Sequence, residues 1–485
     1  MSITAAPPRR LGQILLLLGF AQLIITIDFN IVYVALPEIG DALGFTSQNL
    51  QWVISAYAVA FGGLLVLGGR AADLLGRRRM FVLALSIYGV SSLVGGLAPN
   101  DGVMIGVRAV QGLGGALLFP ATLALVNTLF QEGKERNRAL AVWSACGASG
   151  LCVGSLLGGV LTSAFGWAAV FFVNVPLAGG AALLALALIP RDGAREHGRT
   201  FDLPGAITAT AGITLVVFVL VQGPESGWAS PEILGCVLAV VVLLSAFAVI
   251  EGRSADPLMP LRLFNNRSLS TAMAIALVFG ATYSTVPYFL TVFFQSIHDY
   301  NALQTGLVFL VPAALIAVGT QISGRMAGKV SLRIILILGM SIGIVGTAVL
   351  AAGMNSGGSF LQVLPGVALY GIGQGITWTG MWIAAASGVA GNEQGVASAM
   401  TSTAMQVGTA VGLAVLVAVA NNGTRGLTGD AFQDKLGDGL QLAVYLAAAG
   451  IVLGILASFA FAKPAVVAED ELELELEPVT AGSKD

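Results

Sequence analysis

The chain contains about fourteen apolar runs, each roughly the 20 residues that a helix needs to cross a bilayer. Only 10% of the 485 residues are charged, against roughly 25% in soluble proteins. So few charges cannot cover a soluble globule, and helices satisfy their own backbone hydrogen bonds in lipid. The sequence therefore predicts an all-α polytopic membrane protein. We expect spans near residues 11–35, 52–70, 80–98, 102–128, 139–163, 169–189, 203–222, 232–250, 269–295, 305–323, 335–353, 362–388, 396–420 and 440–462.

The distribution of basic residues supports this topology. If the N-terminus is cytoplasmic, 20 of the 23 Lys and Arg residues fall in segments on the cytoplasmic side of the membrane. The exceptions are Arg108, Arg425 and Lys435. Lys and Arg are enriched in cytoplasmic loops, so we expect an even number of spans, cytoplasmic termini and a location in the cell's inner membrane. The first run resembles a signal peptide, but it is too long and lacks a small-x-small cleavage site, which favours a span.

Several classes of function are disfavoured. The three cysteines lie inside apolar runs, which excludes a disulfide scaffold, and a net charge of −3 without a soluble basic patch disfavours nucleic acid as a partner. The sequence contains no P-loop, no H-E-x-x-H or Cys–His cluster and no G-x-S-x-G elbow. We therefore expect no enzyme, no ATP, no metal and no cofactor. The acid–Leu alternation after residue 462 could form a strand or a docking peptide, but its composition favours a disordered acidic tail.

Two ionisable side chains, Asp28 and Arg108, lie well inside the spans. Burying a charge in a membrane is costly, which makes each a candidate functional residue. At 1.5 Å per residue, both lie about 10 Å beneath the outer surface, so we expect them to meet. A structural ion pair is one interpretation. The other is a carboxylate that titrates, because Arg108 favours the charged form of Asp28 while desolvation favours the neutral form.

Glycines and a short loop form a candidate conformational gate. In the fifth run, Gly147, Gly150, Gly154 and Gly158 share one helical face, which allows another helix to approach closely. The loop "GRAADLLGRRR" after the second run combines glycines at fixed offsets with an acid at a helix end, which indicates a tight cytoplasmic turn. The predicted gate comprises Gly69, Asp73, Gly76, Arg77, Arg78, Gly154, Gly158 and Gly159.

Polar and aromatic residues within the spans are candidates for a substrate cavity. Some of them are expected to hold helices together or to anchor the protein at the membrane interface, and about half to line the cavity. The set is Asn30, Tyr33, Gln111, Trp143, Asn174, Tyr283, Tyr288, Gln295, Gln321, Gln374, Trp378, Trp382 and Gln406.

Several short motifs occur along the chain in a fixed order. They are "IDFNIVYVALP" from Ile27, the loop after the second run, "RAVQGLGGA" from Arg108, "GSLLGG" from Gly154, "FFVNVP" from Phe171, "FDLPGA", "DPLMPLRLF" and "GVASAMTSTAMQVGTAVGLAV". Together these motifs resemble the fourteen-span drug:proton antiporter branch of the major facilitator superfamily. The resemblance covers about 450 residues and departs from the usual pattern at Ser155, where proline is common, and at Trp167-Ala168, where Trp-Arg is common.

The resemblance implies a fold of two pseudo-symmetric six-helix bundles with an inserted two-span hairpin. The implied segments are 11–189 (first bundle), 190–251 (linker and hairpin), 252–268 (cytoplasmic linker), 269–462 (second bundle) and 463–485 (tail). It also implies a monomeric exporter of small amphipathic compounds, antibiotics among them, that works by alternating access. The proton gradient would drive it, with Asp28 and Arg108 coupling protons to export.

Two other functions stay open. An exporter of an endogenous metabolite, pigment or siderophore would have the same fold. A membrane sensor that transports nothing is a third interpretation. It would normally carry a sizeable soluble domain, whereas the longest loops here have only about twenty residues.

Overall fold

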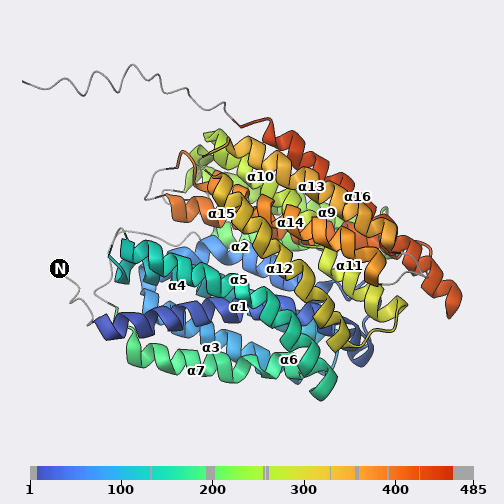
Figure 1. Cartoon of the computed structure of the whole chain (residues 1–485), viewed down its shortest axis with the longest axis horizontal. Helices are drawn as coiled ribbons and strands as arrows, with labels where there is room; N and C mark the ends of the chain where they lie inside the picture. Colours follow the sequence, from blue (N-terminus) through green and yellow to red (C-terminus); the bar gives the residue numbers. More distant parts are fainter. Residues whose placement is uncertain are drawn as a thin grey trace, which may run out of the picture.

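The computed structural model describes residues 8–131, 134–192, 203–254, 257, 261–327, 329–354, 360–389, 393–424 and 426–461. The predicted acidic tail lies outside the described residues. Helices make up nearly all of the described chain, and they correspond to the fourteen predicted runs. Figure 1 shows how they are arranged. The first seven helices are α1 (Pro8–Leu43), α2 (Trp52–Leu75), α3 (Arg77–Gly96), α4 (Asp101–Leu129), α5 (Lys134–Phe165), α6 (Ala169–Phe172) and α7 (Asn174–Leu188).

The remaining helices continue in the same pattern. They are α8 (Leu203–Ser226), α9 (Pro231–Arg253), the short 3-10 helix η1 (Leu261–Asn265), α10 (Arg267–Ala281), α11 (Val286–Val292), the π-helical turn η2 (Phe293–Ile297), α12 (Ala302–Met326), α13 (Leu332–Gly353), α14 (Phe360–Ala386), α15 (Gln394–Ala420) and α16 (Asp430–Ser458). Two predicted spans consist of more than one helix: α6 and α7 form the sixth, while α10, α11 and η2 form the ninth.

The helices form two bundles, which lie one above the other in Figure 1. In the first bundle α1 packs against α5 and α7, while α4 packs against α2 and α3. In the second, α14 packs against α12 and α13, while α10 packs against α15 and α16. The bundles meet along two main seams, α5 against α12 and α2 against α15. Two helical bundles are what the resemblance described above implies.

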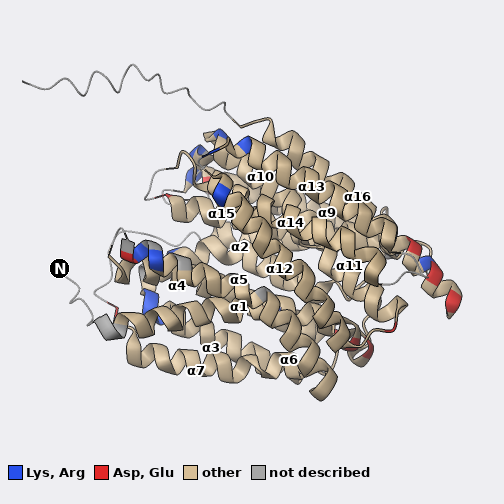
Figure 2. Ribbon diagram, viewed as in Figure 1, with Lys and Arg blue, Asp and Glu red and all other residues tan. Residues whose placement is uncertain are grey.

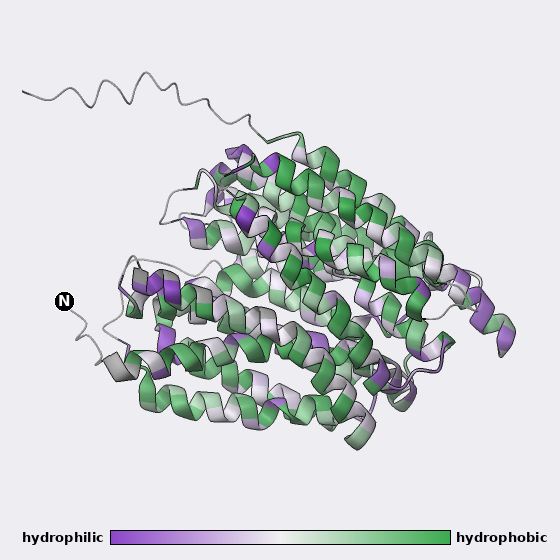
Figure 3. Ribbon diagram, viewed as in Figure 1, coloured by the Kyte–Doolittle hydropathy of each residue, from purple (hydrophilic) through white to green (hydrophobic). Residues whose placement is uncertain are grey.

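Composition agrees with a membrane location. Thirteen helical segments of the described chain are long and apolar enough to cross a bilayer. The other long helix, α14, has 27 residues and is not among these thirteen. Figure 3 shows hydrophobic residues through the middle of both bundles and hydrophilic residues at the two ends. Many large apolar side chains lie exposed on the outside, as expected of a surface that faces lipid.

The two ends of the molecule differ in charge. Lys and Arg residues gather at the end where α1 begins, and acidic residues are prominent at the opposite end (Figure 2). We call these the basic end and the far end. The last turn of α16 also lies at the basic end, because the Phe459 ring lies 4.4 Å from the guanidinium of Arg333 at the start of α13.

Side-chain caps fix several helix starts. The Asn100 side chain accepts a hydrogen bond from Val103 N at the start of α4, and the Asn266 side chain accepts two bonds at the start of α10. At the start of α12, Asn301 and Gln304 exchange bonds in a capping box. Each cap satisfies backbone N–H groups that have no partner within the helix.

Glycines allow the closest helix contacts in both bundles. A Cβ added at Gly150, Gly154 or Gly158 of α5 would lie within 2.9 Å of α1 atoms. The same relation recurs in the second bundle, where Cβ atoms at Gly408 and Gly412 of α15 would lie within 2.3 Å of α10. The predicted glycine face therefore packs α5 against α1, and its repetition on α15 supports the internal symmetry.

The inserted hairpin lies beside the α2–α15 seam. Val217 and Val221 of α8 pack against Val59 of α2 and Ala410 of α15. The other helix, α9, packs mainly against α8, and only 6% of its most apolar window is buried. The hairpin thus touches both bundles through one helix and leaves the other exposed.

The ninth span differs from the prediction of one continuous helix over 269–295. It breaks after Ala281 and resumes at Val286, with Pro287 in the first turn of α11. Proline has no N–H to donate to the carbonyl four residues earlier, which is that of Tyr283. A periodicity of apolar residues does not reveal such a break, because the residues on both sides remain apolar.

Candidate functional site

Asp28 and Arg108 form an ion pair in the interior of the first bundle. Arg108 Nη1 donates to Asp28 Oδ2 at 2.9 Å, and both side chains are 0% exposed. The sequence-based prediction that these two residues meet is confirmed. A buried charge is tolerated only when it is paired and hydrogen-bonded, and both members of this pair make further hydrogen bonds.

Helices α1, α2, α3, α4 and α7 all contribute to the network around this pair. Asn174 Nδ2 donates to the second carboxylate oxygen, Asp28 Oδ1, at 2.7 Å. Arg108 Nε donates to the carbonyl of Val53 at 2.8 Å, and Nη1 also donates to Gln111 Oε1 at 2.8 Å. Gln111 in turn donates to Ser92 Oγ at 2.8 Å. The network therefore ties one carboxylate to five helices of one bundle.

Aromatic rings complete the surroundings of the pair. The Arg108 guanidinium carbon lies 4.6 Å from the centroid of the Tyr57 ring, in reach of a cation–π interaction. Arg108 Nη2 is buried and makes no hydrogen bond within the described part of the chain, and the hydroxyls of Tyr57 and Tyr88 are buried near Asp28. These polar groups lie beside a buried carboxylate. Because the local dielectric is low there, a change of charge at the site alters the energy of its neighbours strongly.

The structure separates the residues predicted for a cavity into groups. Gln111 and Asn174 belong to the buried network and are 0% exposed. Asn30 lies at the α1–α5 contact, beside Gly154, and Gln406 lies at the α2–α15 crossing, beside Gly62. Contact with a substrate stays a prediction for these four.

A second polar site forms where the ninth span breaks. Tyr370 OH donates to the carbonyl of Tyr283 at 2.8 Å, the carbonyl that Pro287 leaves without its helical donor. Tyr33 OH, from α1 of the other bundle, donates to the carbonyl of Ser284 at 3.2 Å. Two tyrosine hydroxyls thus donate to carbonyls within the break. The sequence pattern does not single out Tyr370, because its hydrogen bond depends on the helix break.

A row of aromatic rings leads from this break along α10 and α14. It runs through Tyr283, Phe279 and Trp378, with ring centroids 5.0 Å and 5.6 Å apart. Trp382 continues the row 5.7 Å beyond Trp378. Trp378 is 37% exposed, whereas Tyr283 and Phe279 are buried. Gln374 lies on the same helical face as Trp378, one turn away.

The other predicted cavity residues are scattered. Gln295 links the two bundles, because its Nε2 donates a hydrogen bond to the Val34 carbonyl oxygen of α1 at 2.8 Å. Tyr288 is buried against Phe289 with ring centroids 5.4 Å apart. Trp143 packs 5.4 Å from Phe119 inside the first bundle, and Gln321 is exposed on α12.

The predicted gate residues divide between two contacts. Gly154 and Gly158 face α1 within the first bundle, whereas Gly159 faces α12 of the second, where its Cβ would lie 2.8 Å from Ala302 O. Gly69, close to Pro120, lies on α2 together with the backbone of Asp73, whose side chain is outside the described residues. Arg77 and Arg78 open α3.

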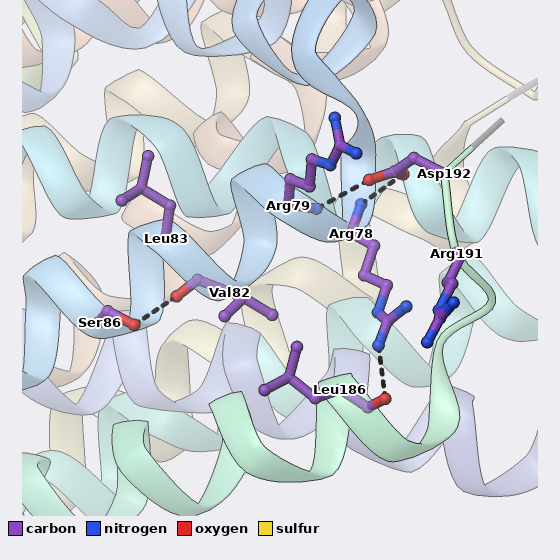
Figure 4. A pocket seen from close by; sticks show the side chains of 8 residues that line it. All are labelled: Arg78, Arg79, Val82, Leu83, Ser86, Leu186, Arg191 and Asp192. Atoms are coloured by element: carbon purple, nitrogen blue, oxygen red, sulfur yellow. Dashed lines mark hydrogen bonds between the residues drawn. The ribbon is translucent and has the colours of Figure 1, made fainter. Parts of the chain in front are cut away.

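Gly76 and Asp192 explain the tight turn between α2 and α3. Gly76 has φ of +105°, which side chains rarely adopt, and its missing Cβ leaves room for the Asp192 carboxylate. Asp192 accepts from Arg78 N and Arg79 N, both at 3.0 Å, and so caps α3 (Figure 4). Because Asp192 lies more than 110 positions from its partners, local sequence patterns could not identify this cap.

Asp192→Ala is expected to lower the free energy of unfolding by about 0.5–2 kcal/mol, the usual cost of losing a helix cap. Asp192→Asn keeps one acceptor oxygen and should lose less. Thermal unfolding of the purified variants, followed by tryptophan fluorescence, measures both. Equal stability of the Ala variant and the parent protein would contradict the cap.

Sequence comparisons place these features in a known family. Residues 18–413 match the Major Facilitator Superfamily. The chain is 37% identical to the puromycin resistance protein of Streptomyces alboniger over 87% of this chain and 84% of that protein. It is 35% identical to the cephamycin export protein of Amycolatopsis lactamdurans, over 92% of each.

Solved structures give the same fold. The POT family transporter PepTSo superposes with a TM-score of 0.65 over 94% of this chain and 97% of that one, at 15% identity. A bacterial homologue of the lysosomal transporter Spinster, in an inward-facing and unoccupied conformation, gives a TM-score of 0.65 at 16% identity over 95% of this chain and all of that one. The chain therefore belongs to the major facilitator superfamily and is a multi-pass membrane transporter rather than an enzyme.

Proposed function

We propose that this transporter is a proton-coupled exporter of small amphipathic compounds, in which Asp28 carries the proton and Arg108 controls its charge. The observation that carries the proposal is the buried pair with its network across five helices. Relatives with 30–37% identity are named for resistance to, or export of, antibiotics, which supports export as the direction.

The contacts between the bundles support alternating access. Tyr33–Ser284, Gln295–Val34 and the packing of Gly159 on Ala302 all lie toward the far end. This set of contacts, the far-end closure, holds the bundles together on that side. Positive charge favours the cytoplasmic side, so we place the basic end in the cytoplasm and take this conformation as closed to the outside.

The proposed mechanism exchanges protons for substrate. Protonation of Asp28 from outside weakens its attraction to Arg108, the substrate leaves, and the carrier turns inward, where Asp28 loses its proton to the cytoplasm. We propose the break at residues 282–285 and the aromatic row behind it as the substrate region, since broken helices mark binding sites in many transporters. We also propose that the two bundles that rock against each other comprise residues 11–189 and 269–462.

The test begins with a growth-inhibition panel that compares cells with and without the gene. A compound to which the gene confers resistance is then loaded into vesicles that contain the purified protein. We expect an imposed pH gradient to drive its accumulation and the addition of compound to release protons. Accumulation that ignores the pH gradient would refute proton coupling. If the panel gives no resistance while a product of the host accumulates in cells that lack the gene, the endogenous exporter is favoured.

A further inference from the structure

A cavity in the described part of the chain lies at the basic end, away from Asp28. It has a volume of about 650 Å³ and lies between α3 and α7 (Figure 4). Arginines line one part of it and apolar side chains another. The lining residues are Arg78, Arg79, Val82, Leu83, Ser86, Leu186, Arg191 and Asp192.

The charge of this cavity is positive and only partly balanced. Asp192 is the one acidic residue that lines it, and both of its oxygens accept backbone N–H groups at the start of α3. Arg78 Nη2 donates to the Leu186 carbonyl on α7, while Arg78 Nε is buried without a partner among the described residues. Three guanidinium groups against one carboxylate leave a net charge of about +2, which suits an anion with several acceptor oxygens.

An apolar groove continues from this cavity along α3. It has a volume of about 480 Å³, and the side chain of Ser86 lines both spaces. Val90, Val94 and Val110 line the groove, and each is more than two-fifths exposed. From Val82 to Val94 the helix rises about 18 Å at 1.5 Å per residue, slightly more than half of a hydrocarbon core about 30 Å thick.

We propose that the cavity and the groove together form a binding site for one phospholipid with an anionic headgroup. The phosphate region lies among Arg78, Arg79 and Arg191, and one acyl chain lies in the groove beside Val90. Basic pockets between helices at the cytoplasmic face suit such headgroups, because arginine bonds phosphate oxygens in pairs. A soluble anion would use the arginines and leave the groove unused.

Native mass spectrometry of the full chain in mild detergent tests the proposal. The probes are phosphatidylglycerol, phosphatidylcholine with the same acyl chains, and soluble glycerol 3-phosphate. We expect one phosphatidylglycerol to bind at least tenfold more tightly than phosphatidylcholine. Arg79→Gln with Arg191→Gln should lower that affinity about 30-fold, since both charges act at the membrane surface. This double variant keeps the Arg78 bond to Leu186 and the Asp192 cap.

Two further variants separate the possible causes. Arg138→Gln with Arg325→Gln removes two exposed charges from the same end outside the cavity and should leave the affinity unchanged. Gly106→Leu fills the groove, since a Cβ there meets no atom within 4 Å, and should weaken binding of phosphatidylglycerol about tenfold. Leucine also favours a helix more than glycine does, so the variant is expected to fold.

Three outcomes would overturn the proposal. Equal affinity for phosphatidylglycerol and phosphatidylcholine would show that the arginines do not recognise the charge of the headgroup. A loss in the control double variant as large as in the cavity variant would show that general surface charge suffices. Competition by glycerol 3-phosphate at the affinity of phosphatidylglycerol, unchanged by Gly106→Leu, would identify a site for a free anion and not for a lipid.

Discussion

Asp28→Asn is expected to reach the membrane and to lose pH-driven export. A proton that moves down 100 mV supplies about 2.3 kcal/mol, enough for roughly a 50-fold substrate gradient, and the variant should lose that gradient. The amide preserves the shape of the carboxylate but cannot take up or release a proton near neutral pH. Accumulation in vesicles across a pH series measures the loss. Asp41→Asn, which changes an exposed acid on the same helix, is the matched control.

Arg108→Ala should reproduce the defect of Asp28→Asn. Removing one partner of a buried ion pair costs about 3–5 kcal/mol if the other stays charged, so Asp28 is expected to hold its proton instead. Arg108→Lys can replace the bonds of Nη1 but not the Nε bond to Val53 O, so part of the coupling should survive. The double variant should be little worse than either single one. Defects that simply add would show that the two residues do not act as partners.

Gly158→Leu and Gly159→Leu are expected to have different effects although the positions are adjacent. At Gly158 the new side chain meets Ile31 of α1, so overpacking should lower the free energy of unfolding by about 1–3 kcal/mol. At Gly159 it meets Ala302 across the seam, so it should push the bundles apart at the far end with a smaller loss of stability. The same energy applied to an open–closed equilibrium shifts it by about 5- to 150-fold.

Thermal unfolding and cysteine labelling separate the two effects. Cys146, Cys152 and Cys236 are first replaced by serine, and Ala302→Cys then reports opening of the far end, because that position is buried in the closed form. Gly159→Leu should raise the labelling rate, and Gly158→Leu should lower the melting temperature. Similar labelling in both variants would show that Gly159 has no special role in closure.

Much of the fold could be predicted because membrane helices leave strong signals in sequence. The lengths of the apolar runs give the spans, and the Lys and Arg positions give an even count. The number of residues from each helix end also predicts that Asp28 and Arg108 lie at the same depth in the membrane, because the rise per residue of a helix is constant. These predictions depend on distances along single helices, which the sequence determines directly.

What could not be predicted depends on how helices rotate against one another. The hydrogen bond from Asn174 to Asp28 is an example, because hydropathy does not determine which face of α7 turns inward. Gly158 and Gly159 looked alike in the sequence but face different bundles. The Asp192 cap and the hydroxyl of Tyr370 join residues far apart in the chain, where no periodicity connects them.

The position of Tyr33 on α1 has a thermodynamic consequence for the proposed cycle. Asp28 and Tyr33 lie five residues apart on one helix, about 7.5 Å along its axis, and Tyr33 bonds Ser284 of the other bundle. Linkage between two sites is reciprocal: if a proton on Asp28 loosens the Tyr33 contact by some factor, breaking that contact tightens proton binding by the same factor. The working pH range of the carrier is then set at the far-end closure as well as at the carboxylate. A substitution that alters only the outer contact would move the pH profile while leaving Asp28 and all its partners in place.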